Sequence, residues 1–529
     1  MPLTFLNWLL AFAPVLAVLV LMLGLGWRAS RAGLVGWVVA LAVAATRFGA
    51  GAVVLGYAQL KGVLLTLDVL YIIWTALLLF HVADQAGAVA VIAERLPNLT
   101  SDRLMQALLL GWVFCSFLQG VGGFGVPIAV VAPLLVGVGF APVAAVVMAS
   151  IGHAWSVTFG SLASSFQALM ASSGLPGPEL APPAALALGV AGLGCGAVVA
   201  HVQGGWRSVW RGLPALVILA AVMGATQYAL AVNRLWTLGA TGAGLAGLIV
   251  GVGVARLPGY RTNKAAVEEQ TQPQAANPSS SMQDRSLGLA LVAYALLIVI
   301  AFSLKLVPLL ADVSNRVAVS FDFPELTTRA GWVTPAGPGR RISLFGHGGA
   351  MLLYTSLLAY AVYQRVGYYA PGAAGRIAQG VLKSALRSSL GILAMVGMAV
   401  TMAHAGMTQI LAEGLSAGIG PRVYPLVAPW IGALGAFMTG SNTNSNVVFT
   451  ALQQQTALLL KLSVPMILAA QTAGGALGSV LAPTKIIVGC STVGLAGEEG
   501  KVLRASLRYG LTLIAGVSVL VWALLEVGA

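Results

Sequence analysis

Two segments of the chain combine polar side chains with helix-breaking glycines and prolines inside apolar surroundings. The first reads FLQGVGGFGVPIAVVAPLL and covers residues 117–135, and the second reads GALGAFMTGSNTNSNVVF and covers residues 432–449. Serine, threonine and asparagine side chains donate hydrogen bonds without carrying a charge. A helix that restarts after a break presents free N–H groups and a positive dipole end. This combination is suited to binding a small anion through its carboxylate and hydroxyl oxygens.

Both segments are expected to lie at bilayer depth, because each is flanked by apolar runs. An unpaired backbone group in hydrocarbon costs several kcal/mol, so broken backbone is tolerated there only inside protein or beside water. We therefore expect both segments to line a solute-filled site; the alternative is a pair of ordinary polar surface loops. The candidate substrate-binding residues are Gly122, Gly123, Phe124 and Gly125 in the first segment and Ser441, Asn442, Thr443, Ser445 and Asn446 in the second.

Three ionisable residues inside or next to apolar runs are candidates for ion coupling or charge recognition. Such a side chain costs ~2.5–3.5 kcal/mol on membrane-insertion scales, so its presence indicates function. His153 can exchange a proton near neutral pH, unless it is a packed, hydrogen-bonded histidine. Lys485 could attract a carboxylate or extend to the interface, and Asp68 could carry a proton or pair with Arg47 or Lys61. Further candidates at helix ends are His81 with Asp84 and His404 with Glu413.

The sequence lacks the patterns of catalytic and metal sites. The segment GLAGEEGK, residues 494–501, does not have the spacing of a phosphate-binding loop, and neither H-E-x-x-H nor G-x-S-x-G occurs. Cys115, Cys195 and Cys490 have neither metal-ligand nor disulfide-framework spacing. We therefore expect a protein that is not an enzyme and that uses no cofactor and no metal.

Composition indicates the elements that must hold these residues. The 529 residues are 58% hydrophobic and only 8% charged, whereas soluble proteins are roughly 25% charged. So few charges cannot cover the several soluble domains that this length would form. The net charge of +13 comes from lysines and arginines mostly in short connections, which is typical of the positive-inside rule rather than of nucleic-acid binding. We predict a multi-pass membrane protein whose partners are lipids and not nucleic acid; its oligomeric state stays open.

The predicted fold is an all-α polytopic bundle of about 12–14 transmembrane helices, each needing ~20 apolar residues. The polar stretch 256–286 cannot bury a core and is expected to be a flexible cytoplasmic linker. It separates a first membrane repeat, 1–255 with a hairpin near 117–140, from a second, 287–529 with a hairpin near 432–460. Two such halves, each with a helix-breaking hairpin, are typical of transporters built from inverted repeats.

Three stretches match a known pattern: GGFGVPIAVVAPLLVGVGF at 122–140, GAFMTGSNTNSNVVFTALQ at 435–453 and STVGLAGEEGKVLR at 491–504. In these stretches, and over essentially its whole length, the chain resembles the L-lactate permease family of bacterial 2-hydroxycarboxylate transporters. The resemblance implies a multi-pass protein of the bacterial plasma (inner) membrane that imports lactate or glycolate, usually with protons as the coupling ion. It also implies paired hairpins whose S-N-T tips hold a carboxylate and move as an elevator.

Two positions depart from the pattern of that family. Its members typically carry Glu where this chain has Gln119 and Asp where it has Asn442. A carboxylate can carry a proton and an amide cannot. We therefore expect either that another group carries the coupled proton or that coupling differs in this chain.

Other functions fit the pattern less well. A carrier of another organic anion, such as a dicarboxylate, would need a cation for the second carboxylate, and only Lys485 or His153 is suitably placed. A proton-translocating subunit of a respiratory complex would need a row of mid-membrane lysines and glutamates, of which the chain has few. A membrane-embedded enzyme would need a catalytic pair at one depth, and none is evident. A transporter of a monocarboxylate is therefore favoured.

Overall fold

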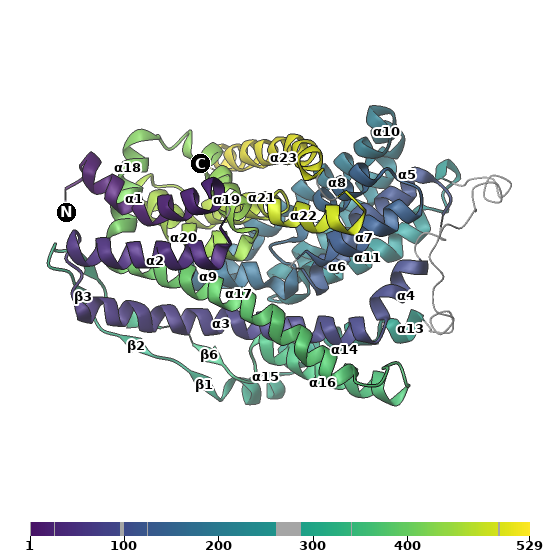
Figure 1. Cartoon of the computed structure of the whole chain (residues 1–529), viewed down its shortest axis with the longest axis horizontal. Helices are drawn as coiled ribbons and strands as arrows, with labels where there is room; N and C mark the ends of the chain where they lie inside the picture. The colour runs from purple at the N-terminus through teal and green to yellow at the C-terminus, as the bar shows by residue number, and fades with distance from the viewer. Residues whose placement is uncertain are drawn as a thin grey trace.

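The computed structural model describes most of the chain as helices. The described residues are 2–25, 27–95, 100–123, 125–260, 287–339, 341–495 and 498–528. Most long helices run along the long axis of the molecule (Figure 1). Phe124 and residues 261–286, which form most of the predicted linker, lie outside the described part of the chain.

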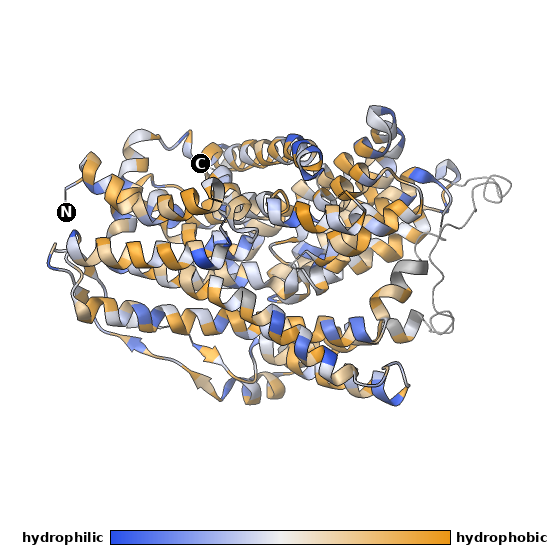
Figure 2. Ribbon diagram, viewed as in Figure 1, coloured by the Kyte–Doolittle hydropathy of each residue, from blue (hydrophilic) through white to orange (hydrophobic). Residues whose placement is uncertain are grey.

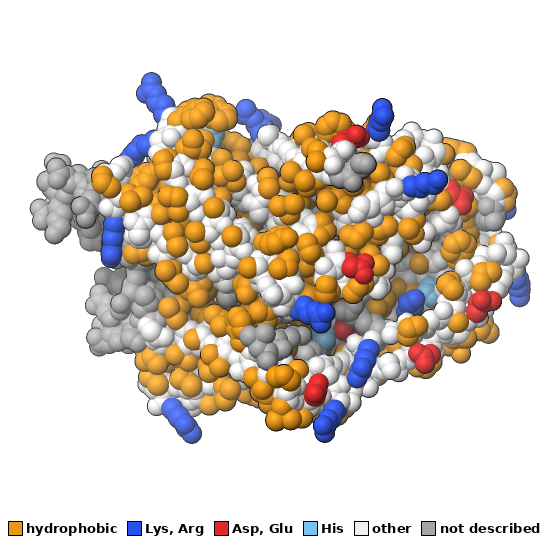
Figure 3. All heavy atoms as spheres, turned by 180° about the vertical axis from the view of Figure 1, so that it is seen from behind, with side chains coloured by type: hydrophobic (Ala, Val, Ile, Leu, Met, Phe, Trp, Pro, Cys, Tyr) orange, Lys and Arg blue, Asp and Glu red, His pale blue; other side chains and the backbone are white. Residues whose placement is uncertain are grey.

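The surface is mainly apolar, as a lipid-facing exterior requires. Within the described ranges, nine helices are long and apolar enough to cross a membrane, or ten if the bent pair Val292–Leu304 and Pro308–Asn315 is one span; three shorter apolar helices accompany them. Figure 2 shows apolar residues along nearly every helix, and Figure 3 shows a face on which lysine and arginine are few and scattered. The prediction of a mainly helical, multi-pass membrane protein is confirmed.

The number of long spans is below the predicted number partly because one element contains two of them. The helix α10, Gly177–Val232, is assigned as one element of 56 residues, whereas the sequence predicts separate spans that start near Pro183 and Leu213. Its backbone leaves the helical conformation at Gly204 and Gly205, and the φ of Gly205 is +68°. Glycine adopts this conformation without steric cost, so α10 is two helices joined by a glycine kink.

A group of helices, called here the scaffold, forms one side of the molecule (Figure 1). In it, α3 packs against α16 and α17, and α17 also packs against α2. A Cβ on Gly62 of α3 would lie 3.5 Å from Cα of Gly397 of α17, so small residues bring these helices close, as is common where lipid supplies no hydrophobic drive. The members are α1 (Phe5–Leu19), α2 (Ala29–Thr46), α3 (Ala52–Gln85), α16 (Gly348–Arg365) and α17 (Ala373–His404).

A second group, called here the hairpin bundle, has the same order of elements in each half of the chain. One helix leads into a tip, a second leads away from it, and a third, which begins at or next to a proline, breaks before a short final helix. In the first half these are α5 (Arg103–Gln106), η3 (Ala107–Phe114) and α6 (Cys115–Val121) in one run, then α7 (Val126–Gly137), α8 (Pro142–Gly152) and α9 (Ser164–Ser173). In the second half they are α19 (Tyr424–Thr439), α20 (Asn442–Leu459), α21 (Val464–Ser479) and α22 (Pro483–Thr492). The shared order supports a duplication, and the inverted orientation of the repeats stays a prediction.

A long β-ribbon, which the sequence did not predict, joins α15 to α16 and lies beside α3 (Figure 1). It is a nested hairpin in which β1 pairs with β6, β2 with β5 and β3 with β4, all antiparallel. Near its tip, Arg329 N–H donates to the Gly49 carbonyl at 2.9 Å. Its strands have two residues each, too short for an alternating pattern: β1 (Ala318–Val319), β2 (Asp322–Phe323), β3 (Leu326–Thr327), β4 (Val333–Thr334), β5 (Gly337–Pro338) and β6 (Ile342–Ser343).

The remaining elements connect or cover these groups. They are η1 (Val20–Gly24), α4 (Ala88–Arg95), η4 (Ala154–Ser156), η5 (Ser161–Ala163), η6 (Trp236–Leu238), α11 (Gly239–Val254), η7 (Pro258–Tyr260), α13 (Leu287–Ala290), α14 (Val292–Leu306), α15 (Pro308–Asn315), α18 (Met407–Gly418) and α23 (Glu499–Gly528).

Candidate anion-binding site at the hairpin tips

The second tip, between α19 and α20, is a tight turn that starts a capped helix. Gly440 ends α19 with φ +69° and ψ +13°, and a Cβ at this position would lie 2.9 Å from Thr484 Oγ1. Ser441 is the N-cap of α20, and its Oγ accepts a hydrogen bond from Asn444 N at 3.3 Å. The break in the second polar segment is therefore present, and its polar residues form the first turns of a new helix.

The first tip is built by glycines that pack against other parts of the hairpin bundle. Gly123 has φ +57° and Gly125 has φ +93°, conformations that strongly favour glycine. A Cβ on Gly123 would collide with Ser161 Oγ, and one on Gly160 would lie 2.8 Å from the Gln119 side chain. This tip therefore rests on the break between α8 and α9.

Among the described residues, the break between α8 and α9 is the one place where consecutive non-glycine residues have positive φ. Ser161, Leu162 and Ala163 are three consecutive non-glycine residues with φ of 45°, 55° and 64°. Each costs roughly 1–2 kcal/mol relative to the right-handed conformation, so the surrounding contacts must hold them in place. Strained backbone of this kind occurs preferentially at functional sites. This conformation could not be predicted from the sequence, because serine, leucine and alanine do not signal positive φ.

A buried polar network joins the break to the second hairpin. Asn442 Nδ2 donates to Thr158 Oγ1 at 3.0 Å, and Asn446 Nδ2 donates to Thr472 Oγ1 at 2.9 Å. The Thr158 and Thr472 hydroxyls lie 3.1 Å apart, as do those of Ser165 and Thr443. Side chains predicted from the second segment therefore meet the first half of the chain, more than 270 residues away in sequence.

Several amide oxygens of this region are buried without a hydrogen-bond donor among the described residues. Asn442 Oδ1, Asn444 Oδ1, Asn446 Oδ1 and Gln119 Oε1 are buried and have no hydrogen-bond partner among the described residues. A buried acceptor without a donor costs about 1–3 kcal/mol. These oxygens would repel a carboxylate but would accept a hydroxyl proton or a cation. Of these oxygens, only that of Asn444 belongs to a residue that lines the cavity at the tips, so it is the acceptor that a ligand there could use.

A cavity of about 300 Å³ lies where the two tips meet the scaffold. Both α20 and α22 begin at this cavity, so two helix N-termini contribute a positive end. Lys485, on the first turn of α22, is the lysine predicted to attract a carboxylate, and its Nζ donates to Ser479 Oγ at 3.3 Å. The lining residues are Gly125, Thr439, Gly440, Ser441, Thr443, Asn444, Thr484, Lys485 and Val488 of the hairpin bundle, with Ser30, Ile73, Gly391 and Ile392 of the scaffold.

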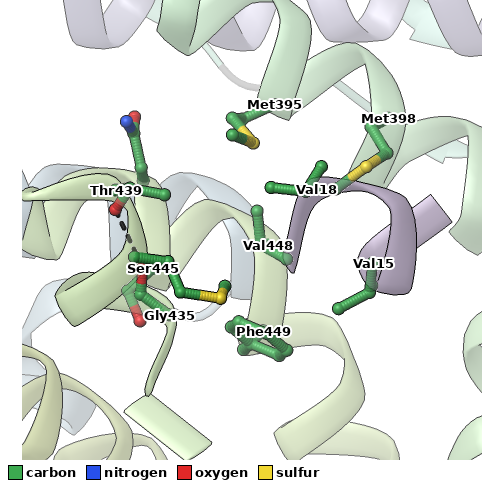
Figure 4. Close-up of a pocket in the computed structure, with 11 residues that line it drawn as sticks. Val15, Val18, Met395, Met398, Gly435, Thr439, Ser445, Val448 and Phe449 are labelled. Atoms are coloured by element: carbon green, nitrogen blue, oxygen red, sulfur yellow. Dashed lines mark hydrogen bonds between the residues drawn. The ribbon is translucent and has the colours of Figure 1, made fainter. Parts of the chain in front are cut away.

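Behind the second tip, the hairpin and the scaffold meet through apolar side chains. Figure 4 shows Met395 and Met398 of α17 opposite Val448 of α20, with Val15 and Val18 of α1 on one side. The void between them is only about 10 Å³, at the limit of what can hold one water. The polar cavity is therefore closed on this side.

The structure brings only some of the predicted site residues to the cavity. Gly125, Ser441, Thr443 and Lys485 line it. The other predicted residues of the second tip, Asn442, Ser445 and Asn446, are buried in the network behind it, and Gly122 and Gly123 support the first tip. Asn444, which lines the cavity, was not among the predicted residues although its neighbours in the same polar run were.

The two other ionisable candidates lie elsewhere. His153 is fully buried at the end of α8, where its Nδ1 lies 2.6 Å from the Ala149 carbonyl, and it does not line the cavity. Asp68 pairs with His347 Nε2 at 3.0 Å, whereas its pairing with Arg47 or Lys61 stays a prediction. The sequence could not indicate this pair, because His347 is the N-cap of α16, 279 residues further along the chain.

Comparison with known proteins shows to which family the chain belongs. The model of the L-lactate permease family matches residues 7–528. The L-lactate permease of Bacillus subtilis (strain 168) is 26% identical over 487 residues, which cover 85% of this chain and 83% of that protein. The glycolate permease GlcA of Escherichia coli (strain K12) is 25% identical over 472 residues, with coverage of 85% and 83%. Among solved structures, the YdaH transporter of Alcanivorax borkumensis aligns with a TM-score of 0.46 at 17% identity, over 87% of this chain and 86% of that chain. Because the family model spans nearly the whole sequence, the chain belongs to the L-lactate permease family.

Proposed function

We propose that this protein is a secondary transporter that imports lactate or glycolate across the bacterial plasma membrane, and that the cavity at the hairpin tips is its substrate site. The observation that carries the proposal is the meeting of two helix N-termini, Lys485 and uncharged donors in one cavity. Relatives named for lactate and glycolate transport support the same substrate class.

The chemistry of the cavity fits a 2-hydroxymonocarboxylate. The carboxylate would accept hydrogen bonds from the first turn of α20 and from Lys485, since charge-assisted bonds to an anion are the strongest available there. The 2-hydroxyl would donate to the amide oxygen of Asn444, which is otherwise unpaired among the described residues.

A dicarboxylate is the second candidate, and the lining argues against it. Among the described lining residues, Lys485 is the single cationic side chain. A second carboxylate would be desolvated without a counter-charge, which is unfavourable. The cavity therefore favours one carboxylate per substrate.

Transport is proposed to be coupled to protons through a group other than Gln119 and Asn442, whose amides do not titrate. His153 and Asp68 are the candidate carriers. His153 lies in the same break as Thr158, whose hydroxyl bonds to Asn442, so its protonation could be sensed at the second tip. Movement of the hairpin bundle against the scaffold would then carry the bound anion across.

Uptake of labelled L-lactate by proteoliposomes, with and without an imposed pH gradient, tests the proposal. Wild type is expected to take up lactate, and Lys485→Gln to lose roughly ten- to a hundred-fold in kcat/KM, the contribution of a charge-assisted hydrogen bond. Lys383→Gln, which removes an exposed charge from α17, is the matched control and should resemble wild type. Absence of lactate and glycolate uptake under every gradient would overturn the proposal.

A further inference from the structure

A second, larger cavity lies between the scaffold and the hairpin bundle. Its volume is about 410 Å³. The scaffold supplies α3 and α17, the hairpin bundle supplies α20 and the end of α9, and the β-ribbon closes one wall. The lining residues are Lys61, Leu65, Ala171, Ser172, Ser173, Gly174, Pro338, Gly339, Val396, Ala399, Val400, Ala403, His404, Val447 and Ala451.

This second cavity lies along the same three helices as the cavity at the tips. On α17 the tip cavity ends at Ile392 and the second cavity begins at Val396, one helical turn further. On α20 the corresponding residues are Asn444 and Val447, and on α3 the tip cavity touches Ile73. The two cavities are therefore neighbours along one seam between the scaffold and the hairpin bundle.

An apolar block separates the two cavities. Ile73 and Ile392 line the tip cavity, Val396 and Val447 line the second cavity, and all four belong with Leu70 of α3 to one buried hydrophobic cluster. A charged solute could not rest among these side chains without losing its hydration. A charged solute would therefore occupy either of the two cavities, but it would not rest in the apolar block that separates them.

The lining of the second cavity is basic. Lys61 and His404 are its ionisable side chains, and none of the described lining residues is acidic. Lys61 is half-buried, and its Nζ lies 5.6 Å from the centre of the Phe323 ring on the β-ribbon, a cation–π contact that holds the ammonium at the cavity. His404 Nδ1 lies 3.0 Å from the Val400 carbonyl; a carbonyl only accepts, so Nδ1 carries the proton and Nε2 is free to accept one from a ligand.

We infer that this cavity is a second binding station for the same small 2-hydroxymonocarboxylate, with Lys61 binding the carboxylate and His404 Nε2 accepting the hydroxyl proton. The inference rests on the proposed function, because it assigns the same substrate to both ends of the seam. The station is weaker than the tip site, since no helix N-terminus of the hairpin bundle begins at it. It holds one anion on its side of the apolar block while another anion binds to or leaves the tip site.

Equilibrium binding of labelled L-lactate to the purified full-length protein in detergent tests the inference. Wild type is expected to bind a second lactate with lower affinity than the first. Lys61→Gln should remove the weaker component and leave the tighter one within two-fold, whereas Lys485→Gln should weaken the tighter component on the order of ten- to a hundred-fold. Lys61→Arg should retain both components, and Lys383→Gln, the charge control on α17, should match wild type.

Uptake by the same variants separates a binding role from a structural one. Lys61→Gln is expected to lower kcat with an unchanged thermal unfolding temperature; if that variant is unstable, His404→Gln takes its place in both measurements. A single lactate per chain that is unaffected by Lys61→Gln would overturn the inference and leave the proposed function intact. Loss of both components in Lys61→Gln would overturn it as well, because the sites would not be separate. Failure of wild type to bind any lactate would contradict the proposed function itself.

Discussion

The two hairpin tips share an order of elements, but the first tip is built of glycines and the second of polar side chains and a helix N-terminus. The first tip is made of glycines and contributes shape: Gly123 is pressed against Ser161, and only Gly125 of its described residues lines the cavity. The second tip contributes chemistry, with the Ser441 cap, the α20 N-terminus and the Asn444 amide. The difference indicates that two halves with the same order of elements can each keep a backbone break, while the groups proposed to bind the ligand are concentrated in one half.

The largest effect is expected from adding one methyl group to the first tip. In Gly123→Ala the Cβ would collide with Ser161 Oγ, and the φ of +57° would be strained. The strain alone costs roughly 1–3 kcal/mol, so we expect loss of nearly all lactate uptake and a lower unfolding temperature. Gly137→Ala on α7, whose Cβ would meet nothing within 4 Å, is the control and should behave as wild type. Equal activity of the two variants would show that the first tip has no shaping role.

Replacing Asn442 at the second tip by an aspartate should change the coupling of lactate uptake to protons more than it changes the affinity for lactate. Asn442 bonds to the hydroxyls of Thr158 and Thr472, which can rotate to donate to an aspartate instead. We expect Asn442→Asp to fold and to make uptake depend more steeply on pH than in wild type, because a proton must then be bound or lost at the tip. Initial uptake rates between pH 5.5 and 8 would measure this, and identical pH profiles would contradict it.

Substrate selection should depend on the acceptor that the second tip offers. Asn444→Ala removes the amide proposed to receive the 2-hydroxyl. We expect about a ten-fold loss in kcat/KM for lactate, the scale of one hydrogen bond, with little change for inhibition by propionate, which lacks the hydroxyl. Competition assays in proteoliposomes give both values. An equal loss for both acids would argue that Asn444 only supports the fold.

The smallest expected effect is on the cap of α20. Ser441→Ala removes the Oγ that accepts from Asn444 N and should lower stability by ~0.5–2 kcal/mol, with a modest rise in KM. Ser491→Ala, which removes an exposed hydroxyl bonded to the Val488 carbonyl, is the matched control. Thermal unfolding of both variants in detergent measures the difference; no difference would mean that Ser441 does not cap the helix.

Some parts of the candidate site could be predicted because short stretches of sequence determine them. Glycine, serine and asparagine clusters between apolar runs signalled both helix breaks, and Lys485 stood out because a charge next to a membrane span is costly. The left-handed run Ser161 to Ala163 gave no such signal, since serine, leucine and alanine do not favour positive φ. The Asp68–His347 pair was equally hidden, because only the folded chain brings these residues together.

The fold class could also be predicted from short stretches of sequence, because each membrane helix is marked by its own apolar run. Hydropathy identified the membrane helices, including the two spans within α10, but it could not show that these join through a kink at Gly204 and Gly205. Nor could it show the β-ribbon, whose two-residue strands are too short for an alternating pattern.

The central claim is that the substrate carboxylate binds at the second tip, between the N-terminus of α20 and Lys485. Electron cryo-microscopy of the purified protein with saturating L-lactate tests it most directly. We expect ligand density in the cavity lined by Gly125, Asn444 and Lys485, and no such density in a lactate-free control. Density for lactate at another place, with this cavity unchanged between the two maps, would contradict it.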